Sequence, residues 1–249
     1  MTQISAVIIT KNEEKNIGRC LTSLRDIADE IIVIDSNSTD KTEEICLSYF
    51  AKFIKRDFAG YSATKNFGNS LAQLPYILSI DADEELSEEL RQTLLSMKSS
   101  MNADGYTVNR LTNYCGKWIK HCGWYPDTKL RIWKTGIGEW QGSIHEKVVM
   151  QQNNIKQLKG DLLHYSYPTV ESHIRQINLF TELMATEMFG KNKKAGLCKI
   201  LFSPRFKFFK KYILQLGFLD GYQGYVVCKM SAYYNFCKYA KLREMKNEK

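Results

Sequence analysis

The 249-residue sequence contains no run of apolar residues long enough to cross a lipid bilayer, which takes about 18 to 20 of them. It also contains no C-x-x-C pair, no internal repeat, no low-complexity linker and no apolar secretory segment at its N-terminus. These absences argue against a membrane-spanning protein, a repeat array and a secreted disulfide scaffold. With 44% hydrophobic and 25% charged residues, the composition is that of a folded globular chain. We expect one large domain, or one domain with a small appendage.

The seven cysteines, an odd number, do not suggest a disulfide framework. We therefore expect reduced thiols in a cytoplasmic protein. Two cysteines and two histidines could in principle collect a zinc ion, although their spacing matches no common zinc motif. These four residues are Cys115, His121, Cys122 and His145.

Positive charge is concentrated in the last part of the sequence. Residues 191–249 carry 14 basic and 3 acidic side chains, a net charge of +11, whereas residues 1–190 have a net charge of −3. Within this tail, residues 197–218 mix Phe, Leu and Ile with Lys and Arg, which is typical of a helix lying in a membrane interface. We expect the tail to bind an anionic membrane surface. A helical hairpin packed on the rest of the chain and a homodimer contact are the alternatives.

Apolar and helical patterns alternate over the first hundred residues. Residues 4–10, 30–34 and 76–80 are predicted strands, each apolar enough to be buried on both faces. Helical spacing follows each strand, with a capping-box pattern at Asp40 and Glu43 and a further helix over residues 63–72. This order predicts a parallel α/β sheet, in which ligands bind outside the carboxyl ends of the strands. Those ends are residues 10–13, 35–38 and 81–83.

The pattern changes after residue 105. Residues 106–110, 129–133 and 147–150 are predicted strands, and residues 170–189 are a predicted helix. Three aromatic residues occur in the loops between these strands: Trp118, Trp124 and Tyr125.

The most specific motif is Asp81-Ala82-Asp83, directly after a buried strand. Two carboxylates at a strand end can coordinate Mg²⁺ or Mn²⁺ and leave part of the coordination shell to phosphate oxygens. The alternative is a solvated acidic turn before the next helix, since four glutamates follow within six residues. The position at a strand end favours the metal site.

Several separate segments resemble one enzyme family. SAVIITKNEEKNIGRCLTSL, IIVIDSNSTDKTEEI, ATKNFGNSLA and YILSIDADEELSEEL are similar to family-2 glycosyltransferases, which have the GT-A nucleotide-diphospho-sugar transferase fold. HCGWYPDTKLRIW, GSIHEKV, LLHYSY and FLDGYQGY resemble a narrower group, the lipopolysaccharide core β-1,4-glucosyltransferases. The resemblance implies an α/β fold with a Rossmann-like, mostly parallel sheet and a helical C-terminal extension. It implies a catalytic domain over residues 1–189 and a basic, aromatic-rich segment over residues 190–249.

The resemblance also implies a nucleotide-sugar site. Thr10, Glu13 and Asp35 would line the uracil and ribose pocket, although Asp35 could instead cap the loop that follows it. Lys65 falls where many relatives carry an arginine near the nucleotide; a lysine supplies the charge without the planar fork.

The cation in such enzymes is Mg²⁺ or Mn²⁺. The resemblance implies that Asp81 and Asp83 hold it, with Asp83 the more direct ligand. His164 would complete the metal shell, or would be a packed histidine on a strand.

Family-2 enzymes typically invert the anomeric centre, with one carboxylate taking the proton from the acceptor hydroxyl. The resemblance makes Glu146 the expected base, and Asp127 and His145 are the alternatives. His145 could also orient Glu146. The aromatic residues at 118, 124 and 125 would contact acceptor sugars or simply fill the core.

The sequence therefore predicts an inverting, cation-dependent hexosyltransferase. The expected donor is UDP-glucose, and the expected acceptor is a lipid-linked lipopolysaccharide core oligosaccharide at the inner face of the cytoplasmic membrane. Another donor sugar, or an acceptor in capsule or glycoprotein assembly, is the alternative within the family. A basic nucleic-acid-binding protein and a non-catalytic sugar-binding module are the alternatives from other classes. The positive charge lies outside the α/β body and no nucleic-acid-binding motif is present, so we expect no nucleic-acid partner.

Overall fold

The computed structural model describes residues 1–142, 146–151 and 154–247, with side chains up to residue 245. Its residues form two compact units. Unit 1 comprises Met1–Arg110 and Asp127–Tyr165, and unit 2 comprises Leu111–Pro126 and Ser166–Lys249. The compact units divide the chain at positions other than residues 189 and 190. The predicted boundary between a catalytic domain and a basic C-terminal segment stays a prediction.

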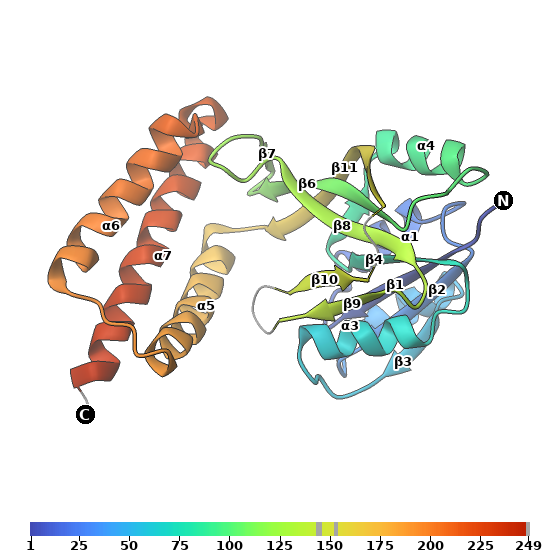
Figure 1. Ribbon diagram of the computed structural model, residues 1–249, viewed down its shortest axis with the longest axis horizontal. Helices are drawn as coiled ribbons and strands as arrows, with labels where there is room; N and C mark the ends of the chain where they lie inside the picture. The colour runs from blue at the N-terminus through green and yellow to red at the C-terminus, as the bar shows by residue number, and fades with distance from the viewer. Residues whose placement is uncertain (143–145, 152–153, 248–249) are drawn as a thin grey trace. The chain divides into compact units, whose positions relative to one another are not determined.

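Unit 1 is built on a large sheet in which the strands follow the order β3-β2-β1-β4-β8-β6-β11-β5 (Figure 1). The strands β3, β2, β1 and β4 are parallel, whereas β8 is antiparallel to β4 and β6 is antiparallel to β8. A separate antiparallel pair joins β9 and β10. The bounds of these strands are β1 Ile4–Thr10, β2 Glu30–Asp35, β3 Lys52–Lys55, β4 Tyr76–Asp81, β5 Glu84–Leu86, β6 Gly105–Tyr114, β8 Asp127–Lys134, β9 Gly138–Gln141, β10 Lys147–Met150 and β11 Ile155–Tyr167.

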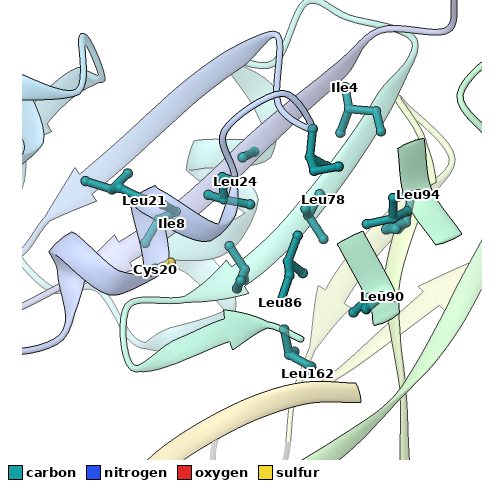
Figure 2. Packing of buried hydrophobic residues seen from close by; sticks show 14 of the residues in the cluster. Ile4, Ile8, Cys20, Leu21, Leu24, Leu78, Leu86, Leu90, Leu94 and Leu162 are labelled. Atoms are coloured by element: carbon teal, nitrogen blue, oxygen red, sulfur yellow. The ribbon is translucent and has the colours of Figure 1, made fainter. Parts of the chain in front are cut away.

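Both faces of β1 are covered, which explains why its sequence is apolar through its centre, residues 6–9. Ile4, Ala6 and Ile8 point to one face, where they join a core cluster with α1 and α4. Figure 2 shows Ile4 and Ile8 in this cluster with side chains from other elements: Cys20, Leu21, Leu24, Leu78, Leu86, Leu90, Leu94 and Leu162. Val7 points to the opposite face, where α3 covers the sheet. The helices of unit 1 are α1 Ile17–Ser23, α2 Thr42–Ser48, α3 Tyr61–Ser70 and α4 Glu88–Met97.

The predicted α/β fold is confirmed, and the differences are local. Five strands were not predicted. Four of them, β3, β5, β7 (Lys117–Ile119) and β9, have only three or four residues each, and β11 begins with a largely polar stretch that does not have the pattern of a buried strand. The capping box at Asp40 is also absent. The helix α2 begins instead at Thr42, whose backbone N–H and hydroxyl both donate to Asp40 Oδ1.

Unit 2 is largely helical. The hairpin of β6 with β7 (Lys117–Ile119) contributes Tyr114 and Ile119 to a core shared with Val227. The helices α5, α6 and α7 lie side by side in Figure 1, and a π-helical turn η1 and a 3₁₀ turn η2 connect α6 to α7. Their bounds are α5 Val170–Gly190, α6 Leu197–Phe209, η1 Lys210–Leu214, η2 Gly217–Asp220 and α7 Gly221–Asn247. Among the described helices, none combines the length and the apolar character that a membrane crossing requires.

Candidate functional site

The polar residues that follow the parallel strands of unit 1 meet at one edge of the sheet. Thr10 lies beside Asp35 in the β1–β2 register, and Ile9 lies beside Asp81 in the β1–β4 register. The predicted site residues at the carboxyl ends of β1, β2 and β4 therefore lie close together.

Asp35 occupies the loop-capping role that the sequence left as an alternative. Its side chain is completely buried and accepts hydrogen bonds from Thr10 Oγ1 at 2.8 Å and from Ser38 N and Oγ at 2.8 and 2.5 Å. These bonds tie the ends of β1 and β2 together. Asp35 thus orients Thr10 and the following loop.

Glu13 lies in the loop after β1 and is partly buried. Its carboxylate accepts a hydrogen bond from Asn16 Nδ2 at 2.8 Å, and its backbone N–H donates to Thr42 Oγ1. Burial raises the pKa of Glu13 above its usual value, although the bond from Asn16 opposes this effect.

Asp81 is held between two buried cations. Its Oδ1 lies 2.9 Å from Lys65 Nζ, and its Oδ2 lies 3.0 Å from Arg131 Nη2. Burial alone would raise the pKa of Asp81, but these two positive charges hold it well below the usual aspartate value. Asp81 is therefore an ionised carboxylate.

Lys65 links Asp81 to the predicted base. Lys65 is only 3% exposed, and its Nζ also lies 3.2 Å from Glu146 Oε1 and 4.3 Å from the centre of the Trp140 ring. The ammonium group of Lys65, which lies on α3, is thus shared by two carboxylates. One is Asp81 at the end of a strand, and the other is Glu146, 81 positions further along the chain than Lys65.

Arg131 and Glu84 were not among the predicted site residues. Glu84 Oε1 accepts a hydrogen bond from Arg131 Nη2 at 2.5 Å, and Glu84 Oε2 accepts one from the backbone N–H of Asp81 at 3.0 Å. Both side chains are almost completely buried. The sequence did contain a signal for a buried charge, because Arg131 lies between two apolar strand residues, Leu130 and Ile132.

The alternative base Asp127 is bound to arginine and lysine side chains. Arg110 donates to Asp127 Oδ2 from Nε at 3.1 Å and from Nη2 at 2.8 Å, and Lys129 Nζ lies 2.9 Å from Oδ1. The other alternative, His145, lies outside the described residues.

Asp83 and His164 come together across the antiparallel pairing of β5 with β11. His164 Nε2 lies 3.2 Å from Asp83 Oδ2, and His164 Nδ1 is buried without a hydrogen-bond partner. A carboxylate oxygen and an imidazole nitrogen are both ligands that Mn²⁺ accepts, so this pair fits a cation site. Within residues 1–142, 146–151 and 154–247, no three His, Cys, Asp or Glu side chains gather closely enough to hold a metal ion.

The predicted aromatic and zinc residues between β7 and β8 belong to unit 2. Trp124 packs edge-on against Tyr114, with ring centres 6.0 Å apart, in the core of that unit. Cys122 lies 3.5 Å from Cys228 (Sγ to Sγ), also in that core. Core packing is therefore the observed role of Trp124 and Cys122.

This chain matches a glycosyltransferase family model and is similar to two glycosyltransferases over nearly its whole length. A model of glycosyl transferase family 2 matches residues 5–148. The chain is 32% identical to an uncharacterized glycosyltransferase of Rickettsia bellii, over 98% of this chain and 87% of the relative. It is 29% identical to the lipopolysaccharide core biosynthesis glycosyltransferase LpsC of Rhizobium meliloti, over 96% of this chain and 91% of the relative. Among solved structures, S. aureus TarS 1–349 matches with a TM-score of 0.47 and 14% identity, over 100% of this chain and 92% of that one. The chain belongs to glycosyl transferase family 2 and is a glycosyltransferase.

Proposed function

We propose that this glycosyltransferase transfers a hexose, glucose from UDP-glucose, with inversion to a lipid-linked lipopolysaccharide core oligosaccharide. The observation that carries the proposal is the ammonium group of Lys65, which holds Glu146 beside the strand-end carboxylate Asp81. This arrangement puts one candidate base next to a turn that can bind a diphosphate.

The donor would bind at the carboxyl ends of β1 and β4. Thr10 and Glu13 would line the nucleoside pocket, with Asp35 behind them, since it is buried and bonded to Thr10. Lys65 would stabilise the charge that develops on the departing diphosphate, because a buried ammonium group acts strongly on nearby negative charge.

A divalent cation, Mg²⁺ or Mn²⁺, would be held by Asp83 and His164, whose side chains lie within 3.2 Å of each other. When bound, it would neutralise charge on the diphosphate leaving group. Asp81 would support this site through the turn that it shares with Asp83. Both of its carboxylate oxygens are already engaged by Lys65 and Arg131, so we no longer expect it to be a direct ligand.

Glu146 would accept the proton of the acceptor hydroxyl as that oxygen attacks the anomeric carbon. Lys65 contacts its Oε1, so Oε2 is the oxygen expected to take the proton. The contact with Lys65 would orient Glu146 before the acceptor binds.

The proposed acceptor follows from the relative LpsC, whose name refers to lipopolysaccharide core biosynthesis. A lipid-linked acceptor places the enzyme at the inner face of the cytoplasmic membrane, and the basic residues 191–249 would bind the anionic surface. Another donor sugar, or a capsule or glycoprotein acceptor, remains the alternative. Family membership makes the chain a transferase, so neither nucleic-acid binding nor sugar binding without catalysis is its main function.

The test is calorimetric titration with UDP, with and without Mn²⁺, combined with a transfer assay over a panel of UDP-sugars. Asp83→Ala should lose the cation-dependent part of UDP binding. Glu146→Gln should bind UDP normally and lose on the order of 10²- to 10⁴-fold in transfer rate. Glu139→Gln, at an exposed position of β9, is the matched control and should leave both properties unchanged.

Two outcomes would overturn the proposal. Absence of UDP binding in all conditions would exclude a UDP-sugar donor. Full transfer activity of Glu146→Gln would exclude Glu146 as the base and favour the alternatives, Asp127 and His145.

A further inference from the structure

The helix α6 has one side packed against α7 and the opposite side in solvent. Ile200 is buried, and Ser203 Oγ accepts a hydrogen bond from Asn235 Nδ2 of α7 at 3.1 Å. These two residues identify the inner side. Residues spaced three or four apart share one helix face. By this spacing the outer side carries Cys198, Phe202, Phe206 and Phe209.

The outer side is apolar and strongly exposed. Phe202, Phe206 and Phe209 are 64%, 65% and 50% exposed. We call the following five exposed residues the α6 face: Leu201, Phe202, Phe206, Phe209 and Ile213. A contiguous apolar surface of this kind marks a contact with another molecule or with a membrane.

The charges around the α6 face have one sign. Residues 191–219 contain eight basic side chains and no acidic one. The next acidic residue, Asp220, is only 3% exposed and accepts hydrogen bonds from the backbone N–H groups of Lys120 and His121. An approaching anionic surface therefore meets apolar and positive groups without a competing exposed carboxylate in this stretch.

We propose that the α6 face inserts into the headgroup region of an anionic bilayer. The phenylalanine rings would enter the boundary of the acyl chains. The exposed cations Lys199, Arg205 and Lys210 would bind lipid phosphates. In the structure Lys199 Nζ lies 5.0 Å from the centre of the Tyr239 ring of α7, and Arg205 Nη1 donates to the Leu201 carbonyl oxygen, so these two side chains would turn toward the lipid on binding. This deepens the proposed function, on which it rests for the membrane-bound acceptor, by identifying α6 as a membrane-contact surface.

Charge favours a bilayer over a second copy of the chain. A symmetric dimer joined by this face would bring two sets of positive charge together, because an isologous interface uses the same surface on both partners. Like charges placed opposite each other oppose association. Anionic phosphates instead complement the basic side chains and leave the aromatic rings a matching apolar layer.

The experiment is co-sedimentation of the full chain with vesicles of phosphatidylcholine alone, or with phosphatidylglycerol as about a third of the lipid. Binding should require phosphatidylglycerol and should weaken at ~1 M salt, where the Debye length falls to about 3 Å. The triple variant Phe202→Gln/Phe206→Gln/Phe209→Gln should lose at least about 10-fold in binding. Removing three cations with Lys199→Gln/Arg205→Gln/Lys210→Gln should weaken binding by on the order of 100-fold.

The matched control changes exposed apolar residues of unit 1, in the triple variant Leu47→Gln/Phe50→Gln/Phe58→Gln. It should bind vesicles like the wild type. UDP titration of every variant separates this inference from the proposed function, since each should bind UDP normally. If the wild type does not bind UDP but does bind anionic vesicles, the UDP-sugar donor is refuted and the membrane role of the α6 face is still supported.

A probe on the surface itself gives an independent measurement. Cys198 is exposed on the outer side of α6, so its thiol can carry an environment-sensitive fluorophore. Its emission should shift to shorter wavelength with phosphatidylglycerol vesicles, and a label on Leu47→Cys/Cys198→Ser should not shift. The inference is overturned if the wild type ignores anionic vesicles. It is also overturned if sedimentation velocity shows a dimer that the phenylalanine variant dissociates while vesicle binding persists.

Discussion

Replacing Arg131 with methionine tests whether the buried charges of the site are mutually dependent. The guanidinium Nη2 lies 2.5 Å from Glu84 Oε1 and 3.0 Å from Asp81 Oδ2, and Nη1 lies 3.5 Å from the Ser79 carbonyl oxygen. Arg131 is 3% exposed and Glu84 is 1% exposed, so water cannot replace the lost cation. Arg131→Met therefore leaves the almost fully buried Glu84 with only the longer ion pair to Arg110 Nη1, at 3.6 Å, and leaves Asp81 with Lys65.

Removing one partner of a buried ion pair costs about 3–5 kcal/mol, because the other charge stays buried without compensation. For a chain of this size, 1 kcal/mol lowers the melting temperature by about 2–4 °C. Arg131→Met should then lower Tm by on the order of 10 °C in a calorimetric scan. Arg131→Met/Glu84→Gln should recover more than half of this loss, since glutamine is neutral and still accepts the Asp81 N–H.

The control is Arg175→Met, which removes an arginine from an exposed pair with Glu171 on α5. It should change Tm by no more than about 2 °C, as exposed pairs contribute little. If Arg131→Met behaves like Arg175→Met, the reasoning about buried charge in this site is wrong. If the double variant is no more stable than Arg131→Met, the loss does not come from the stranded Glu84 charge.

Three further predictions concern other residues. Burial lowers the pKa of His173 to about 4, so the unfolded chain binds its proton first as the pH falls. The free energy of unfolding should therefore fall by roughly 3 kcal/mol as the pH is lowered from 6.5 to 4. Denaturant titrations at several pH values should show that His173→Phe removes this part of the pH dependence, and an unchanged pH dependence would contradict the assignment. Gly68→Ala would place a Cβ 2.5 Å from Val7 Cγ1, so urea unfolding should show that the free energy of unfolding falls by about 1–3 kcal/mol. Adding Val7→Ala should restore part of this loss. A stabilised Gly68→Ala variant would mean that Val7 and the sheet shift to make room for the methyl group. Lys65→Met should reduce transfer at least about 10-fold, because it removes the cation shared by two carboxylates; unchanged kinetics would exclude its proposed role.

The parallel core of unit 1 could be predicted from the sequence because its signals are local. Apolar runs at residues 4–10, 30–34 and 76–80 are too short for helices, and helical spacing follows each of them. Parallel strands bring their carboxyl ends to one edge, so Asp35 and Asp81 could be placed together without a structure. Of the later strands, β6, β8 and β10 were predicted in position, although β6 extends four residues beyond the predicted end at residue 110, whereas β7, β9 and the 13-residue β11 were not predicted.

The family resemblance pointed to Lys65, Asp81, Asp83, Glu146 and His164, but not to Arg131 and Glu84, which contact Asp81. Contacts between residues far apart in the sequence, such as Arg131 and Glu84, leave no local pattern, because side-chain pairing across a sheet depends on the strand order. The Arg131–Glu84 pair forms because β8 lies next to β4. In the sequence, Glu84 could not be distinguished from the other acidic residues that follow Asp83. Asp83 and His164 meet only because β5 pairs with β11.

The sequence by itself determined the α/β class, the strand-end carboxylates and the basic tail, since these depend on residue periodicity and composition. Tertiary structure alone decided which carboxylates are buried and which cations neutralise them. It buries Asp35 as a cap for the loop, binds Asp81 between Lys65 and Arg131, and leaves one face of α6 apolar and exposed. The physical reason is that burial and charge pairing depend on which distant segments pack together, and that information is not contained in any short stretch of the chain.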